Sequence, residues 1–239
     1  MRNPVQSGAS AGDSSLRVDR RNFMGRVAAG AVAVAAAGIP LARAEGEVPS
    51  RPASSPGPIG PWSDAWLDRI KGKHRQFFDA VTPNDGFALA FAMNFLDQNN
   101  DVYGLKDADL SAVVGLRHFA MPMALTDAIW AKYKLGEFCK VTDPATKAPA
   151  TRNIFTHGET LMFPNSAIGT LADRNVIFTV CNVALVGLAG LVAEKGGVSP
   201  EVARKEWAAA LLPGMTLVPV GVLAVNRAQE HGCTYCYGG

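Results

Sequence analysis

This sequence of 239 residues lacks the short motifs that usually disclose the chemistry of an enzyme. It contains no Walker loop for nucleotide phosphates, no glycine fingerprint for a dinucleotide and no G-x-S-x-G elbow for a serine nucleophile. No internal repeat is visible. Only four cysteines and four histidines are present, so each thiol and imidazole that could carry chemistry can be considered by its position.

An excess of charge of one sign is also missing once the amino-terminal segment is set apart. The chain has 23 Lys and Arg residues against 21 Asp and Glu, but residues 1–44 hold six of the arginines and two of the aspartates. The remaining 17 basic and 19 acidic residues give a net charge near −2. Nucleic acid and anionic membranes are therefore not expected partners. Beyond residue 44, no run is long and apolar enough to span a bilayer.

The first 44 residues are typical of a twin-arginine export signal. The motif DRRNFM at residues 19–24 precedes a weakly apolar run from Val27 to Leu41, and Ala-Arg-Ala at residues 42–44 is a small-residue cleavage signal. A membrane-spanning helix is the alternative, but the run is rich in Ala and Gly and shorter than the roughly 20 residues that a span needs. We therefore expect a mature chain that begins at Glu45 and is periplasmic or otherwise exported.

The rest of the chain is predicted to be one domain of α/β class. Residues 45–61 are rich in Pro, Ser and Gly and are expected to form a flexible tether, whereas residues 62–239 suffice for a substantial core. Apolar strand patterns alternate with helical ones, which predicts a parallel sheet with helices on both faces and Rossmann-like layering. The predicted strands are His74–Val81, Leu110–Arg117, Val176–Val180, Met215–Val220 and Cys233–Tyr237.

Helices are predicted between these strands. A cap at Ser199 with Pro200 in the first turn indicates one that runs to about Leu212. The polar segment from Glu137 to His157 is expected to be an irregular excursion. The other predicted helices are Phe87–Gln98, a helix from Thr126 or Asp127 to Gly136, a helix over residues 158–173 broken at Pro164, a helix after Cys181, and Gly221–His231.

Cys181 lies where a buried strand is predicted to run into a helix. The five residues before it are β-branched or aromatic, as a parallel strand covered on both faces requires, and apolar residues then recur at helical spacing. Ligands of open α/β sheets bind at such strand ends. Amide groups at a helix N-terminus favour the thiolate, which is the reactive form of cysteine. The alternative is a free cysteine that packs as a small hydrophobic residue.

Two stretches resemble the DsrE/DsrF-like sulfur-relay family. They are FTVCNVAL at residues 178–185, with the cysteine at the strand end, and MTLVPVGVLAVNRAQEHGCTY at residues 215–235. With the order of the elements, the likeness spans roughly residues 73–235. The resemblance implies a compact α/β domain in which Cys181 takes up sulfane sulfur as a persulfide and hands it to a partner, within homo-oligomers or hetero-oligomers.

Further residues are candidates to shape the Cys181 site. His118 follows the second strand, so a parallel sheet places it at the same edge as Cys181, where an imidazole can shuttle the thiol proton. Arg117 can serve an anionic sulfur substrate, although strand alternation predicts that Arg117 and His118 point to opposite sides. The structural alternative is a loop-capping His118 and an Arg117 that forms an ion pair. The candidate substrate-binding residues are Asn84, Asp85, Arg117 and Asn182.

Cys233 and Cys236 form a C-x-x-C pair near the end of the chain. The spacing leaves three possibilities open: a redox disulfide, half of a metal site, or two unrelated thiols that point the same way from a strand. A metal site would need further ligands, of which His231 is nearest in sequence, with His157 or Cys139 available only through the fold. No histidine follows Cys236, which excludes the usual c-type haem attachment sequence.

The sequence thus favours an exported α/β protein that binds or transfers sulfane sulfur through Cys181, with His118 as the second candidate catalytic residue. A homo-oligomer and a sulfur-donor or sulfur-acceptor protein are the expected partners, and no cofactor is assigned. Two alternatives remain open. One is a non-catalytic ligand-binding or assembly subunit in which Cys181 only packs, and the other is a thiol redox or metal protein centred on Cys233 and Cys236.

Overall fold

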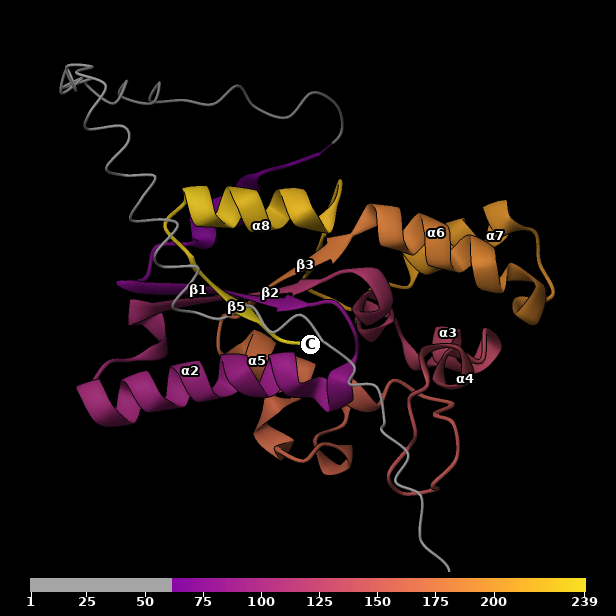
Figure 1. Ribbon diagram of the computed structural model, residues 1–239, viewed down its shortest axis with the longest axis horizontal. Helices are drawn as coiled ribbons and strands as arrows, with labels where there is room; N and C mark the ends of the chain where they lie inside the picture. The colour runs from indigo at the N-terminus through magenta and orange to yellow at the C-terminus, as the bar shows by residue number, and fades with distance from the viewer. Residues whose placement is uncertain (1–61) are drawn as a thin grey trace, which may run out of the picture. The chain divides into compact units, whose positions relative to one another are not determined.

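The computed structural model describes residues 62–239, and both the predicted signal over residues 1–44 and the predicted tether lie outside this range. One five-stranded sheet organises the described part (Figure 1). All neighbouring strands pair in parallel, in the order β4-β3-β2-β1-β5, which confirms the predicted α/β class. The strands are β1 His74–Ala80, β2 Leu110–Leu116, β3 Ile177–Cys181, β4 Met215–Val218 and β5 Thr234–Tyr237.

Helices cover both faces of the sheet, as expected. In Figure 1, α2 (Phe87–Tyr103) and α5 (Ile168–Asp173) lie below the sheet, and α8 (Gly221–Glu230) lies above it. The larger core lies on the α2 face, whereas a smaller core joins α8 to the short 3-10 helix η1 (Ala65–Arg69). Strand alternation divides the side chains between them, so that Phe78 enters the first core and Phe77 the second.

Two further helices continue from the carboxyl edge of the sheet. They are α6 (Asn182–Val192), which follows β3 directly, and α7 (Pro200–Ala209), which packs against it. The hydroxyl of Ser199 accepts a hydrogen bond from the amide of Val202 at 3.3 Å, which confirms the predicted cap. The helix ends three residues before Leu212 because the Leu212 amide donates to the Ala124 carbonyl instead.

The helix predicted from Thr126 to Gly136 is wrong as a single element. It is divided into α3 (Asp127–Lys132) and α4 (Leu135–Cys139), because Lys134 adopts a left-handed conformation with φ of 52°. Gly136 lies inside α4 rather than at a helix end. A side chain there would collide with the backbone of Ala150, so the glycine permits a close approach of two chain segments.

The segment between α4 and β3 is irregular but tightly anchored. Asn153 is fully buried, and its side-chain amide donates to the carbonyl oxygens of Met123 (2.8 Å) and Leu125 (2.7 Å). Its side-chain oxygen accepts from the amide of Phe155. The helix predicted over residues 158–173 is broken as expected, and only its last part is α-helical. The short 3-10 turns before it are η5 Ile154–Thr156, η6 Gly158–Thr160 and η7 Pro164–Ser166, and α5 follows.

None of the single helices within residues 62–239 has the length and apolar character needed to cross a membrane. The segments Asn182–Gly196 and Pro200–Ala209 reach that length and composition only when taken together, and they are bent by 112° relative to each other.

We expect Gly115→Ala to destabilise the domain. Gly115 lies in β2, and a methyl group there would overlap the ring of Phe77 in the α8-side core. Such overpacking costs about 1–3 kcal/mol of unfolding free energy, measurable by urea denaturation. Gly169→Ala in α5 is the matched control because its added methyl group meets no atom within 4 Å, and it should stabilise the domain by up to about 1 kcal/mol. Equal midpoints for the two variants would contradict the described packing of Phe77 on β2.

Candidate functional site

The chain path after β4 creates a crevice at the carboxyl edge of the sheet. The residues of α6 that follow β3 pack into the core on the α2 face, whereas α8, which follows β4, packs on the opposite face. The two connections therefore diverge at the ends of neighbouring strands, which is where open α/β sheets bind ligands. A pocket of about 290 Å³ lies there. It is lined by Arg117, His118, Cys181, Val183, Ala184, Gly187, Leu188, Leu191, Val220, Gly221 and Val222.

Cys181 lies at this pocket, as the last residue of β3 and the N-cap of α6. Its Sγ accepts a hydrogen bond from the amide of Ala184 at 3.4 Å, and the residue is 5% exposed. Alternation along β3 sends Cys181 to the same face as Ile177, which packs beneath α8. The thiol therefore faces the crevice between α6 and α8, and partial charges at the start of both helices favour negative charge on sulfur.

Arg117 is the charged neighbour of Cys181. Leu116 pairs with Val180, so the next step of the register brings Arg117 opposite Cys181. The guanidinium is held in place by Asp79, whose two carboxylate oxygens accept hydrogen bonds from Nε at 2.7 Å and from one terminal nitrogen at 2.9 Å. The hydrogen bond with Asp79 is the main cause that raises the pKa of Arg117, and the charge of a Cys181 thiolate acts in the same direction.

Asp79 and Tyr235 begin a row of interacting side chains that continues through Arg117 to Cys181. Asp79 in β1 is 1% exposed, and its Oδ2 also accepts a hydrogen bond from the Tyr235 hydroxyl at 2.9 Å. Burial is the main cause that raises the pKa of Tyr235, and the bond to Asp79 adds to it, so the hydroxyl stays protonated. The row runs from β5 across β1 and the end of β2 to Cys181 in β3, with its negative charge buried at Asp79.

Gly221 allows α8 to start beside this row. A Cβ at Gly221 would lie 2.6 Å from the Cβ of Arg117 and 2.8 Å from its Cδ, so only glycine lets the helix approach the arginine stem. Gly221 in the stretch at residues 215–235 thus has a structural reason.

His118 and Arg117 both line the pocket, contrary to the expectation that they point to opposite sides. Strand β2 ends at Leu116, and His118 has a left-handed φ of 50°, so the alternation of a strand no longer applies there. The imidazole is exposed and packs edge-on against Phe119 at 4.7 Å between ring centroids. His118 is therefore available to solvent at the wall of the pocket.

The Asn84 and Asp85 loop does not shape this pocket. It follows β1 and leads into α2, which covers the other face of the sheet. Asn84 donates from its side-chain amide to the carbonyl of Gly238 at 3.2 Å, and Asp85 lines a separate small recess beside Leu161. Asn182 is half-buried at the start of α6 and is not among the residues that line the pocket. Asn84 and Asp85 thus lie at the predicted edge of the sheet but toward the face that α2 covers, away from the pocket.

The two cysteines of the C-x-x-C pair point to opposite faces of the sheet. Cys233 is buried in the α8-side core, whereas Cys236 packs against the core on the α2 side. A spacing of three residues along a strand has this effect, because side chains alternate with a period of two. Both thiols are free, and burial raises the pKa of Cys233 to about 11 and raises that of Cys236. In this structure the two thiols are therefore neither joined in a disulfide nor turned to the same side, which were two of the three possibilities that the spacing left open.

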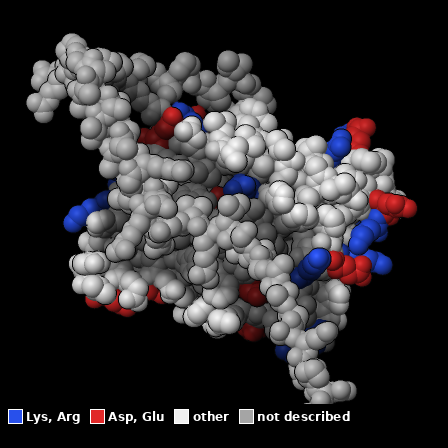
Figure 2. All heavy atoms as spheres, in the orientation of Figure 1, with Lys and Arg blue, Asp and Glu red and all other residues white. Residues whose placement is uncertain are grey.

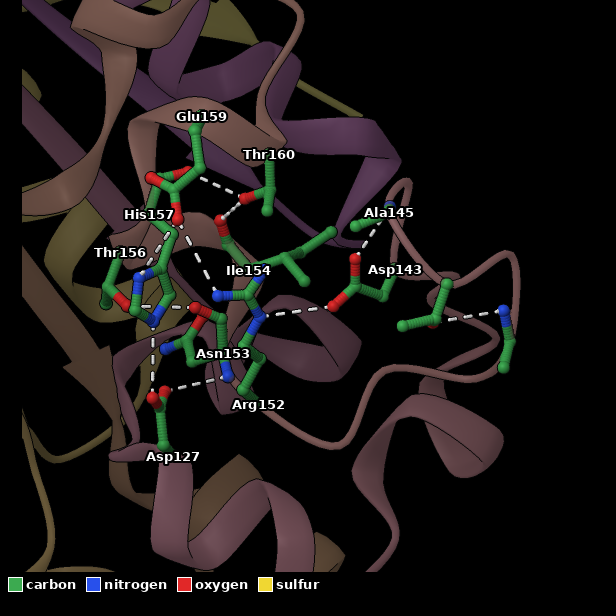
Figure 3. Close-up of polar contacts among 12 residues, drawn as sticks. Asp127, Asp143, Ala145, Arg152, Asn153, Ile154, Thr156, His157, Glu159 and Thr160 are labelled. Atoms are coloured by element: carbon green, nitrogen blue, oxygen red, sulfur yellow. Dashed lines mark hydrogen bonds and ion pairs between the residues drawn. The ribbon is translucent and has the colours of Figure 1, made fainter.

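His157 belongs to a polar cluster far along the chain from these cysteines (Figure 3). Its Nε2 lies 3.2 Å from Asp127 and its Nδ1 lies 3.6 Å from Glu159. His231 instead contacts the carbonyl oxygen of Arg227 through Nδ1 at 2.9 Å. Within residues 62–239, no group of three or more His, Cys, Asp or Glu side chains is arranged to hold a metal ion.

Sequence reasoning missed Asp79, Tyr235 and Gly221 at this site. Asp79 is the one acidic residue within an otherwise apolar strand end, FFDAV, and a buried carboxylate requires a partner. That signal could have found the ion pair with Arg117, but the sequence gives no indication that β5 pairs with β1 and brings Tyr235 to the same place. Comparison of the chain with models of protein families and with curated protein sequences finds no match.

We expect Arg117→Met to lower the unfolding free energy at pH 7 by about 3 kcal/mol, because it leaves the buried Asp79 carboxylate with only the Tyr235 hydroxyl as partner. Adding Asp79→Asn to Arg117→Met should recover part of the loss. The control is Lys205→Met, which breaks an exposed pair with Glu201 and should cost less than about 0.5 kcal/mol. Chemical denaturation of all three variants checks this, and equal losses for Arg117→Met and Lys205→Met would refute the buried anchor.

Proposed function

We propose that this protein binds or transfers sulfane sulfur as a persulfide on Cys181. The observation that carries the proposal is a free thiol that faces a pocket between two helix starts, with Arg117 and His118 on the wall of the same pocket. The proposal extends the DsrE/DsrF-like resemblance, in which the matching position is the sulfur-carrying cysteine. Export through the twin-arginine pathway and assembly into homo-oligomers are parts of the same proposal.

The transfer step needs no cofactor. The Cys181 thiolate attacks the outer sulfur of a donor persulfide, R–S–SH, so that a new sulfur–sulfur bond forms on Cys181 and the donor bond breaks. The electron pair of the broken bond leaves on the donor as R–S⁻, and the outer sulfur keeps its proton. Attack by thiolate on a sulfur–sulfur bond is the same reaction as thiol–disulfide exchange.

Three groups near Cys181 support this step, each in a different way. His118 is exposed at the wall and can take the thiol proton from Cys181 to solvent. The amide of Ala184 already donates to Sγ and stabilises negative charge there. Arg117 supplies a fixed positive charge that does not have to reorganise during the reaction, because Asp79 holds it.

A non-catalytic ligand-binding or assembly subunit is the second candidate function. Most of the pocket lining is apolar, and several exposed apolar side chains lie at its rim. They are Val183, Leu191 and Val222. In this case a small apolar ligand or a partner surface would occupy the pocket and Cys181 would remain unmodified.

Intact-mass spectrometry with peptide mapping, after exposure of the native protein to inorganic polysulfide, tests the proposal. We expect added sulfur on Cys181 and its loss in Cys181→Ser. Cys236→Ser is the matched control because it removes a thiol on the other face of the sheet, and it should load as the unchanged protein does. Equal loading of Cys181→Ser and the unchanged protein would exclude the sulfur-carrier role, and an unmodified Cys181 would favour the ligand-binding subunit.

A further inference from the structure

The walls of the Cys181 pocket are almost free of charge. Helix α6, from Asn182 to Val192, has no ionisable side chain at all, and the start of α8 adds Val220 and Val222. Figure 2 shows the same pattern on one face of the molecule, where the surface over α8 and α6 is mainly uncharged and charged side chains gather beyond it. A small hydrophilic anion would have to leave its water shell to enter such a space.

Charge at the pocket is concentrated at one end, beside the thiol. Arg117 lies there, and two of its five guanidinium N–H groups donate to Asp79. The other three N–H groups of Arg117 donate no hydrogen bond to any residue in the described range 62–239. The first residues of α6 and α8 meet at the same end, and their free amides favour negative charge. The pocket therefore offers apolar contact along its walls and stabilisation of an anion near the sulfur.

The volume indicates a small ligand. At about 290 Å³ the pocket is just below the roughly 300–1,000 Å³ range of small-molecule sites. Gly187 contributes to this space, because a Cβ at that position would meet no atom within 4 Å. The pocket thus exceeds what a single sulfur atom on Cys181 requires.

Resting on the proposed function, we propose that the donor for Cys181 is uncharged sulfane sulfur in a ring or chain, of which cyclo-octasulfur is the simplest member. An apolar wall recognises such a molecule by contact alone, since sulfur chains neither donate nor require hydrogen bonds. The donor itself is neutral, and the negative charge of the step starts on the Cys181 thiolate, at the end of the pocket where Arg117 and the helix starts lie. That end of the pocket therefore stabilises the attacking thiolate and the sulfur atom that first takes the charge as the ring opens, whereas the apolar walls hold the neutral donor.

The step balances without an added oxidant. The Cys181 thiol first releases its proton to water by way of His118. The thiolate then attacks one ring sulfur, so that one sulfur–sulfur bond forms to Cys181 and one ring bond breaks. The electron pair of the broken bond remains on the far end of the opened chain, which becomes a terminal polysulfide anion. All eight sulfur atoms stay attached to the protein, and the donor sulfur is reduced as Cys181 is oxidised.

The test compares cyclo-octasulfur, dispersed in a small fraction of organic solvent, with inorganic tetrasulfide at equal total sulfur. The initial loading of Cys181 in the native protein is followed by mass spectrometry. We expect cyclo-octasulfur to load Cys181 at least about tenfold faster in the native protein than in the urea-unfolded chain, because only the folded pocket concentrates an apolar donor. Gly187→Leu fills the pocket and should lower that native rate about tenfold, an effect of the size seen when apolar pockets change by a few methylene groups.

Gly169→Leu is the matched control. Both glycines are helical, exposed and without a neighbour within 4 Å of an added Cβ, but Gly169 lies in α5, outside the pocket. It should load as the unchanged protein does. If tetrasulfide loads Cys181 but cyclo-octasulfur loads the native and the unfolded protein at equal rates, or loads the two leucine variants at equal rates, the uncharged donor is overturned while the persulfide role stands. Absence of loading from both reagents would instead overturn the proposed function itself.

Discussion

The site depends on the return of the chain from one edge of the sheet to the other. Strands β1 to β4 are added in one direction, and β5 then pairs beside β1 at the far edge. Helix α8 must therefore cross the face that α2 leaves open, while α6 remains with the larger core. Because neighbouring strands β3 and β4 send their helices to opposite faces, neither helix can fill the space between their ends.

The buried pair of Asp79 and Arg117 turns this space into a chemical site. Burial of a carboxylate is costly, and two hydrogen bonds from one guanidinium, with a third from Tyr235, offset that cost. The same bonds hold Arg117 next to Cys181, so one interaction serves both the fold and the electrostatics of the pocket. Gly221 completes the arrangement because it lets α8 begin against the arginine stem.

The sequence was sufficient to predict the strands, most of the helices and the position of Cys181 at a strand end, since strand and helix patterns are local. All five strands, the cap at Ser199 and the parallel α/β class were predicted from such patterns. Strand order and the packing of one element on another are not local, and most of the differences follow from them. Asn84 and Asp85 were assigned to the correct edge, but the face of the sheet depends on where α2 packs. The C-x-x-C spacing left a pair open, whereas the extended chain at β5 turns the two thiols to opposite faces of the sheet. The break at Lys134 accompanies the close approach of Gly136 to Ala150, a tertiary contact that no local pattern contains.

We expect Cys181 to react as a thiol in the native protein, whereas Cys139 and Cys233 stay unreactive. The most direct measurement is the rate of labelling of each cysteine by a small neutral alkylating reagent in the native protein, from pH 6 to pH 8. We predict that Cys181 is labelled in the native state, whereas Cys139 and Cys233 stay unlabelled until unfolding, because burial raises their pKa values to about 12 and about 11. Protection of Cys181 to the same degree as Cys139 and Cys233 would contradict the account and leave Cys181 as a packing residue.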